Sequence, residues 1–102
     1  MAETMLEPGD PSRAHVWVTG RVQGVGFRAY VEYNARQIGI KGWVRNVGYE
    51  TVEALLEGTH EQVETLILLM KTGPRAAHVD ECRVEYETPA GEFRDFQVKS
   101  SR

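Results

Sequence analysis

The chain has 102 residues, and 41% of them are hydrophobic, which is enough for one continuous core and leaves no room for a second domain. Its formal net charge of -3 gives no general attraction to nucleic acid or to anionic membrane surfaces, because both need clustered, uncompensated Lys and Arg. No apolar run approaches the ~18 residues that a membrane span requires. We therefore expect a protein that binds neither nucleic acid nor membranes.

The cysteine and histidine residues show whether a disulfide or a zinc site is expected. The single cysteine, Cys82, cannot form an internal disulfide, so a reducing cytoplasm is the simplest setting. No pair of Cys and His residues has zinc-ligand spacing. The sequence therefore predicts a cytoplasmic protein without a metal site or a cofactor.

The N-terminal segment differs in composition from the rest of the chain. Residues 1–12 contain three acidic residues and two prolines among scattered apolar side chains. They lack the basic start and the apolar stretch of a signal peptide. We interpret residues 1–12 as a flexible N-terminal tail and place the folded domain at residues 13–102.

The first half of the domain predicts a strand, a loop and a helix. Apolar Ala14, Val16 and Val18 alternate with their neighbours over residues 14–19, which is the period-2 pattern of a strand with one buried face. Residues 20–26 then contain three glycines. Beyond them the apolar spacing changes to a period of 3.6, which predicts a helix from about Phe27 to near Gly39.

The second half predicts a hairpin, a second helix and one or two further strands. Residues 41–46 and 51–57 form the expected hairpin, with Gly48 between them. Thr59 and Gln62 fit a capping box, which begins a helix that Gly73 and the following proline end. Residues 78–86 predict a strand, and residues 96–98 a short edge strand.

This order of elements indicates an α+β fold, the ferredoxin-like βαββαβ sandwich. Two helices should cover one face of a four- or five-stranded antiparallel sheet. Handed crossovers place the strands at residues 14–19 and 51–57 in its centre. Because this fold serves many unrelated functions, the function has to come from the residues of a site.

The segment Gly20–Arg28 is the candidate site, since it joins a strand to the N-terminus of a helix. Helix N-termini carry unpaired N–H groups and a partial positive charge, and Gly24 and Gly26 lack the Cβ atoms that would hold an anion away. Arg28 is poorly placed for the helix dipole but well placed to fork two N–H donors onto the same anion. The segment therefore predicts a cradle for a phosphate-like anion.

A purely structural role fits the same residues. A flexible glycine connector with Arg28 as a solvated surface cation is equally consistent with the composition. The segment lacks the Gly-Lys-Ser/Thr end of a P-loop and the glycine spacing of the dinucleotide fingerprint. Asn46 taken alone is typical of a turn, because Asn tolerates left-handed dihedrals. The residues by themselves leave both interpretations open.

Two blocks of sequence together resemble a known family. Gly-Arg-Val-Gln-Gly-Val-Gly-Phe-Arg at residues 20–28 and Gly-Trp-Val-Arg-Asn at residues 42–46 closely resemble the acylphosphatases, and the similarity spans about residues 13–99. The family often has a glycine four residues after the motif asparagine, where this chain has Glu50, and the hairpin glycine is Gly48 instead. We expect a turn of different shape. Position 26, an aromatic in some members, is glycine here, which should change pocket volume more than chemistry.

The resemblance implies a function and a set of site residues. The expected enzyme is an acylphosphatase, which hydrolyses the carboxyl-phosphate bond of small acyl phosphates to a carboxylate and inorganic phosphate without a metal. Arg28 would bind the phosphoryl group and Asn46 would orient the attacking water. The cradle would be completed by the backbone amides of Val22, Gln23, Gly24, Val25, Gly26 and Phe27. The expected partners are the acyl phosphate substrate and the phosphate product, and the expected state is a monomer.

Two other classes of function stay open. A non-catalytic sensor of small anions could use the same cradle, and similar modules occur as parts of larger carbamoyl-transfer proteins. An RNA-binding domain of this fold would need paired aromatics on the central strands and a basic sheet. Residues 51–58 contain no aromatic and two acids, which argues against RNA binding.

Overall fold

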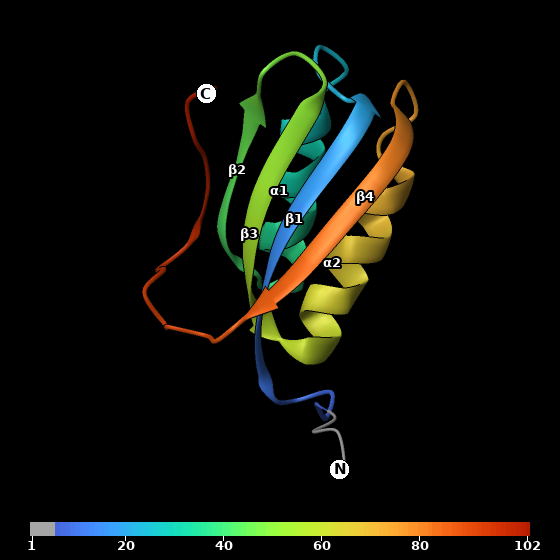
Figure 1. Ribbon diagram of the computed structural model, residues 1–102. Helices are drawn as coiled ribbons and strands as arrows, with labels where there is room; N and C mark the ends of the chain where they lie inside the picture. The colour runs from blue at the N-terminus through green and yellow to red at the C-terminus, as the bar shows by residue number, and fades with distance from the viewer. Residues whose placement is uncertain (1–5) are drawn as a thin grey trace.

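The computed structural model describes residues 6–102. Within these residues, two helices pack side by side on one face of a five-stranded sheet (Figure 1). The elements are β1 (Pro11–Arg21), α1 (Phe27–Ile38), β2 (Lys41–Val47), β3 (Thr51–Thr59), α2 (His60–Thr72), β4 (His78–Glu87) and β5 (Phe96–Val98). This is the α+β fold that the order of elements predicts.

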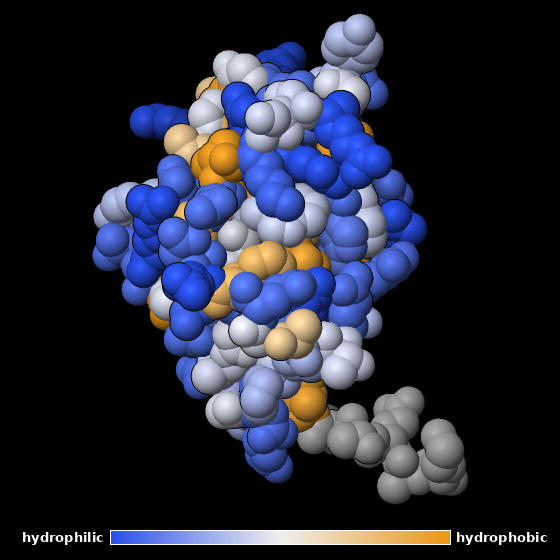
Figure 2. All heavy atoms as spheres, turned by 90° about the vertical axis from the view of Figure 1, so that its left-hand side faces the viewer, coloured by the Kyte–Doolittle hydropathy of each residue, from blue (hydrophilic) through white to orange (hydrophobic). Residues whose placement is uncertain are grey.

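The strand order in the sheet is β4-β1-β3-β2-β5. The prediction that β1 and β3 lie in the centre is confirmed, and both pair antiparallel with their neighbours. The prediction of a fully antiparallel sheet is wrong at one edge, because β5 pairs parallel with β2. After β4, which runs opposite to β2, the chain crosses to the other edge and turns back, so it meets β2 in the same direction. Figure 2 shows this side of the molecule, where hydrophilic side chains surround small hydrophobic patches.

Strand β1 begins earlier than the apolar alternation predicts. Pro11 pairs with Thr59 and Ser12 with Gly58, so the expected boundary between residues 12 and 13 falls inside the strand. The alternation of apolar residues does not predict a strand there because the buried position is occupied by a polar residue, Ser12, which is 2% exposed. The part of the predicted tail at residues 1–5 lies outside the described residues.

Helix α2 begins at the predicted capping box. The Thr59 hydroxyl accepts a hydrogen bond from the backbone N–H of Gln62 at 3.2 Å, and the Gln62 side-chain oxygen accepts one from the backbone N–H of Thr59 at 2.9 Å. Two otherwise unpaired donors are thereby satisfied, which typically stabilises a helix start by about 0.5–2 kcal/mol.

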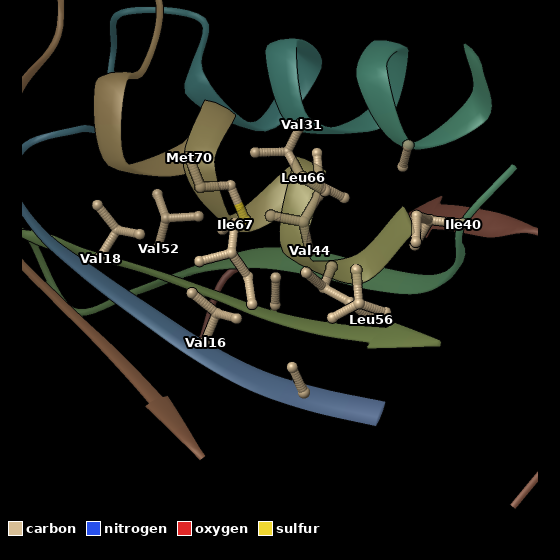
Figure 3. Close-up of a cluster of buried hydrophobic side chains, with 14 of the residues drawn as sticks. Val16, Val18, Val31, Ile40, Val44, Val52, Leu56, Leu66, Ile67 and Met70 are labelled. Atoms are coloured by element: carbon tan, nitrogen blue, oxygen red, sulfur yellow. The ribbon is translucent and has the colours of Figure 1, made fainter. Parts of the chain in front are cut away.

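The core lies between the helices and the sheet (Figure 3). Alternate residues of the strands meet apolar residues of both helices, and each fully buried side chain contributes about 1.5–3 kcal/mol. The buried residues that Figure 3 labels are Val16, Val18, Val31, Ile40, Val44, Val52, Leu56, Leu66, Ile67 and Met70. This packing holds α1 against the sheet and thereby fixes its N-terminus beside the end of β1.

Candidate anion-binding site

The loop between β1 and α1 is anchored at both ends and open in the middle. Val22 and Phe27 are each 1% exposed and belong to the core. Between them, Gly24 and Gly26 have φ of 73° and 78°, a left-handed conformation that strains any residue with a Cβ. Space is not the constraint at either position, since a Cβ there would meet nothing within 4 Å. The two glycines therefore allow the left-handed backbone conformation of the loop, and they place no side chain on its surface.

The N-terminus of α1 is an uncompensated positive pole. Its N-cap, Gly26, supplies no side-chain hydrogen bond, and the first turn contains no acidic residue. The first hydrogen bond of the helix joins the Tyr30 N–H to the Gly26 carbonyl oxygen at 3.0 Å. The N–H groups of the helical residues before Tyr30 therefore have no partner within the helix. The helix dipole and these amides favour an anion at this end.

A pocket of about 290 Å³ lies in front of this helix end. Its lining consists of Val22, Gly24, Gly26, Phe27, Arg28, Ala29, Glu32, Asn46 and Val98. The pocket therefore brings together Arg28 and Asn46, along with four of the other predicted cradle residues. Of the predicted set, Gln23 and Val25 are not part of the lining. Sequence reasoning missed Ala29, Glu32 and Val98.

Arg28 is half-buried on the wall of this pocket. Glu32, one turn further along α1, forms its salt bridge with Arg36 at 3.0 Å. Within residues 6–102, no salt bridge involves Arg28. Its planar guanidinium is therefore free to donate two parallel hydrogen bonds to a ligand anion.

Asn46 enters the pocket from β2. It points to the same face of the sheet as Val44 and is only 9% exposed. Its side-chain oxygen, Oδ1, is buried and has no hydrogen-bond partner. Such a group costs about 1–3 kcal/mol when it stays unsatisfied, so its presence calls for an explanation. A ligand or a ligand-bound water in the adjoining pocket would satisfy the amide.

The side chain of Gln23 points away from the pocket lining and contacts the β2–β3 hairpin. Its side-chain nitrogen, Nε2, lies within 3.3 Å of the carbonyl oxygen of Val47, 3.2 Å of that of Gly48 and 2.9 Å of that of Thr51. The side chain therefore reaches across to the β2–β3 hairpin. Only the backbone N–H of Gln23 is left for the predicted contact with an anion.

A larger cavity, of about 390 Å³, lies near the start of β1 at the other end of the molecule. Helix α2 begins there, but its first N–H groups are already bonded. The N–H of His60 donates to the Asp10 carbonyl at 2.8 Å, and that of Glu61 donates to the Pro8 carbonyl at 3.0 Å. The two helix starts therefore differ, and the one at α1 is the better anion site.

Two further findings concern metal binding and membrane-spanning helices. In residues 6–102, no group of three or more His, Cys, Asp or Glu side chains could hold a metal ion. None of the helices in that range is long and apolar enough to cross a membrane. The described residues form an α+β domain in which Arg28 and Asn46 line one pocket at the N-terminus of α1.

Comparison with known proteins gives the family. A family model described as acylphosphatase matches residues 14–98. An acylphosphatase of Nostoc sp. (strain PCC 7120 / SAG 25.82 / UTEX 2576) is 52% identical over 87 residues, which are 85% of this chain and 85% of that protein. The chain belongs to the acylphosphatase family. The predicted family and enzyme class, a hydrolase acting on acyl phosphates, are confirmed.

Solved structures agree with this assignment. The structure of an acylphosphatase from Coxiella burnetii superposes with a TM-score of 0.83 and 31% identity, covering 87% of this chain and 93% of that chain. A structure of full-length HypF in its phosphate- and nucleotide-bound form superposes with a TM-score of 0.80 and 29% identity. In that case the match covers 90% of this chain but 12% of the other, so the same module occurs inside a much longer protein. The predicted ferredoxin-like fold is confirmed.

Proposed function

We propose that the pocket between α1 and β2 hydrolyses the carboxyl-phosphate bond of small acyl phosphates, without a metal, by attack of an oriented water. Membership of the acylphosphatase family supports the reaction class. One observation supports the assignment of residues. Arg28, which forms no salt bridge within residues 6–102, and Asn46, whose buried Oδ1 atom has no hydrogen-bond partner, line the same pocket.

Arg28 and the loop amides bind the phosphoryl group in this proposal. Phosphoryl transfer passes through a loose transition state with negative charge on the peripheral oxygens, so positioning and electrostatic stabilisation do most of the work. A forked guanidinium and the N–H groups of residues 22–27 supply both. Val22 and Val98 supply apolar side chains to the wall of the same pocket.

Asn46 orients the attacking water in line with the leaving group. The water oxygen bonds to phosphorus as the bond between phosphorus and the acyl oxygen breaks, which yields a carboxylate and inorganic phosphate. The water proton passes to a phosphate oxygen. A carboxylate leaves without protonation because its conjugate acid has a pKa of about 4, so the site needs no general acid.

Several finer expectations belong to the same proposal. We propose that the chain acts as a cytoplasmic monomer that binds no nucleic acid and requires no cofactor. The residues of the cradle other than Arg28 contribute backbone amides, so their side chains set the shape of the loop. The reaction products, a carboxylate and inorganic phosphate, leave by the mouth of the same pocket.

The test uses the purified full chain with two substrates, an acyl phosphate and an aryl phosphate monoester, both in excess chelator. We expect hydrolysis of the acyl phosphate alone, with competitive inhibition by inorganic phosphate, because the cradle binds product as well as substrate. Loss of activity on chelation, restored by magnesium, would refute the metal-free mechanism. Phosphate binding without turnover would instead favour an anion sensor or an inactive module of the kind found in larger proteins.

A further inference from the structure

The cradle loop and the β2–β3 hairpin are held together by one side chain. The Nε2 atom of Gln23 donates to the carbonyl oxygens of Val47, Gly48 and Thr51, at 3.3, 3.2 and 2.9 Å. The amide nitrogen carries two hydrogens and has three carbonyl acceptors, so at least one hydrogen is shared between two of them. Three carbonyl oxygens thus converge on a single donor that comes from another part of the chain.

Val22 and Val25 of the loop pack on the core, and within the described residues no other side chain of residues 22–27 forms a hydrogen bond with the hairpin. Gly24 and Gly26 have no side chains, and the space around each is open to 4 Å. On the hairpin side, the turn between Val47 and Thr51 passes through Gly48 in a left-handed conformation with φ 59°. A second link joins the Gly20 N–H to the Glu50 carbonyl at 3.1 Å, but it lies at the end of β1, ahead of the loop. Gln23 is therefore the side-chain tether between the glycine-rich loop and the hairpin.

The tether ends one residue from Asn46. The Val47 carbonyl belongs to the residue that follows Asn46 on β2, so the bond fixes this end of the strand relative to the loop. Arg28 and the glycines of the loop line the same pocket as Asn46, so the relative position of loop and strand sets the shape of that pocket. The sheet ladder and the backbone bonds of Arg102 with Asn46 and Gly48 hold the hairpin in the sheet, whereas Gln23 supplies the side-chain donor that links it to the glycine-rich loop. Without Gln23, the three carbonyl oxygens lose this shared donor and the loop loses this link to the hairpin.

We propose that Gln23 is a positioning residue that sets the distance between the cradle-bound phosphoryl group and the water oriented by Asn46. This inference rests on the roles proposed above for Arg28 and Asn46. It concerns the distance between two parts of the site, whereas the anion is bound by the cradle itself. In-line attack is sensitive to such geometry, since a displacement of 1 Å can cost ~100-fold in rate.

The experiment is a double-mutant cycle with Gln23→Met and Asn46→Ala in the full-length chain. Methionine keeps the length of the side chain and removes the donor. We expect Gln23→Met to lower kcat by about 10- to 100-fold while the inhibition constant for inorganic phosphate changes less than about threefold. In the Asn46→Ala background, where no oriented water is left to misalign, the same substitution should change kcat by less than about twofold. Enzyme concentrations are raised until the slowest variant is measurable above spontaneous hydrolysis.

A second glutamine provides the control. Gln62 also uses its side-chain amide structurally, donating to the Ile38 carbonyl at 3.0 Å and closing the capping box of α2, far from the pocket. Gln62→Met should lower the melting temperature and leave kcat unchanged. This comparison separates a general loss of stability from the selective loss of kcat expected for Gln23.

Four results would overturn the inference. An unchanged kcat in Gln23→Met, or an equal loss of kcat in both backgrounds, removes the role of Gln23 and leaves the proposed function standing. Phosphate binding that weakens in step with kcat assigns Gln23 to the cradle instead. A near-normal kcat in Asn46→Ala alone overturns the proposed role of Asn46, and this inference with it.

Discussion

Glu32 lines the pocket beside Arg28, but its carboxylate forms a salt bridge with Arg36, at 3.0 Å, rather than with Arg28. Both arginines are four residues from Glu32 on α1. An acidic residue placed N-terminal to its basic partner is the more favourable arrangement on a helix, because it agrees with the helix dipole. Arg36 also donates to the Phe96 carbonyl at 3.1 Å, which ties it to β5. Arg36 thus pairs with the acidic residue of the pocket lining, and Arg28 forms no salt bridge within residues 6–102.

Replacing Arg36 should therefore weaken phosphate binding from a distance. In Arg36→Met, Glu32 loses its partner and becomes free to pair with Arg28, in competition with the ligand. An exposed helix pair of this kind contributes about 0.2–0.5 kcal/mol, so we expect the inhibition constant for phosphate to rise about twofold. Adding Glu32→Gln to Arg36→Met should restore it, because glutamine carries no competing charge. No recovery in the double variant would show that Arg36 acts in another way.

Removing Arg28 should damage both binding and rate. Arg28→Ala takes away a charge-assisted donor that holds the phosphoryl group throughout the reaction, and such a loss typically costs about 2.7–4 kcal/mol. We expect kcat/KM to fall by ~100-fold or more and inhibition by phosphate to weaken. Lysine should restore little, because a point charge cannot reproduce the fork. Steady-state kinetics with phosphate as inhibitor will measure both effects, and unchanged phosphate binding in Arg28→Ala would contradict this role.

Asn46→Ala should separate kcat from binding. The substitution removes no charge from the cradle, so we expect a large fall in kcat with the phosphate inhibition constant changed by less than about threefold. This pattern is typical of an interaction made mainly in the transition state. The Oδ1 atom is unsatisfied in the folded chain, so its loss should leave the melting temperature unchanged or slightly raised. A variant that keeps near-normal kcat would rule out the water-orienting role.

The outer face of the sheet should make the stability depend on acid pH. Burial raises the pKa of Glu53, but hydrogen bonds with Arg45 at 2.7 Å and His15 at 2.6 Å outweigh this effect and hold its pKa below the usual range. A pKa lowered by folding means that Glu53 stabilises the protein above its unfolded pKa of about 4.3. That contribution is lost as the pH falls through the lower, folded-state value.

Glu53→Gln tests this directly. We expect the free energy of unfolding at neutral pH to fall by about 1.5–3 kcal/mol, and the loss of stability between about pH 5 and pH 3 to become shallower. Glu85→Gln is the control, because Glu85 and its partner Arg83 are both more than half exposed and such pairs contribute only about 0–1 kcal/mol. Thermal unfolding followed by circular dichroism across this range measures both variants. An equal acid dependence in the parent and Glu53→Gln would exclude Glu53 as the titrating group.

Local chemistry in the sequence determined much of this protein. The Thr59–Gln62 capping box, the glycine-rich loop and the alternation of Val16 and Val18 all depend on neighbours within a few residues. Such interactions can be read without the fold, because backbone dihedrals, helix caps and strand faces repeat with short, fixed periods. The same local pattern placed Arg28 at a helix start, which is why an anion site could be proposed from the sequence.

Only the tertiary structure decided how separate segments meet. The parallel direction of β5 depends on where the chain crosses after β4, and the burial of Ser12 depends on its pairing with Gly58. Gln23 gives no sign in the sequence that its side chain leaves the loop for a hairpin, and Val98 joins the pocket from the last strand. Contacts of this kind depend on the packing of the whole core, which sets distances between residues that no local period relates. The sequence by itself therefore determined the helices, most of the strands and the glycine-rich loop before Arg28, whereas the placement of Asn46 beside that loop was decided by the assembled sheet.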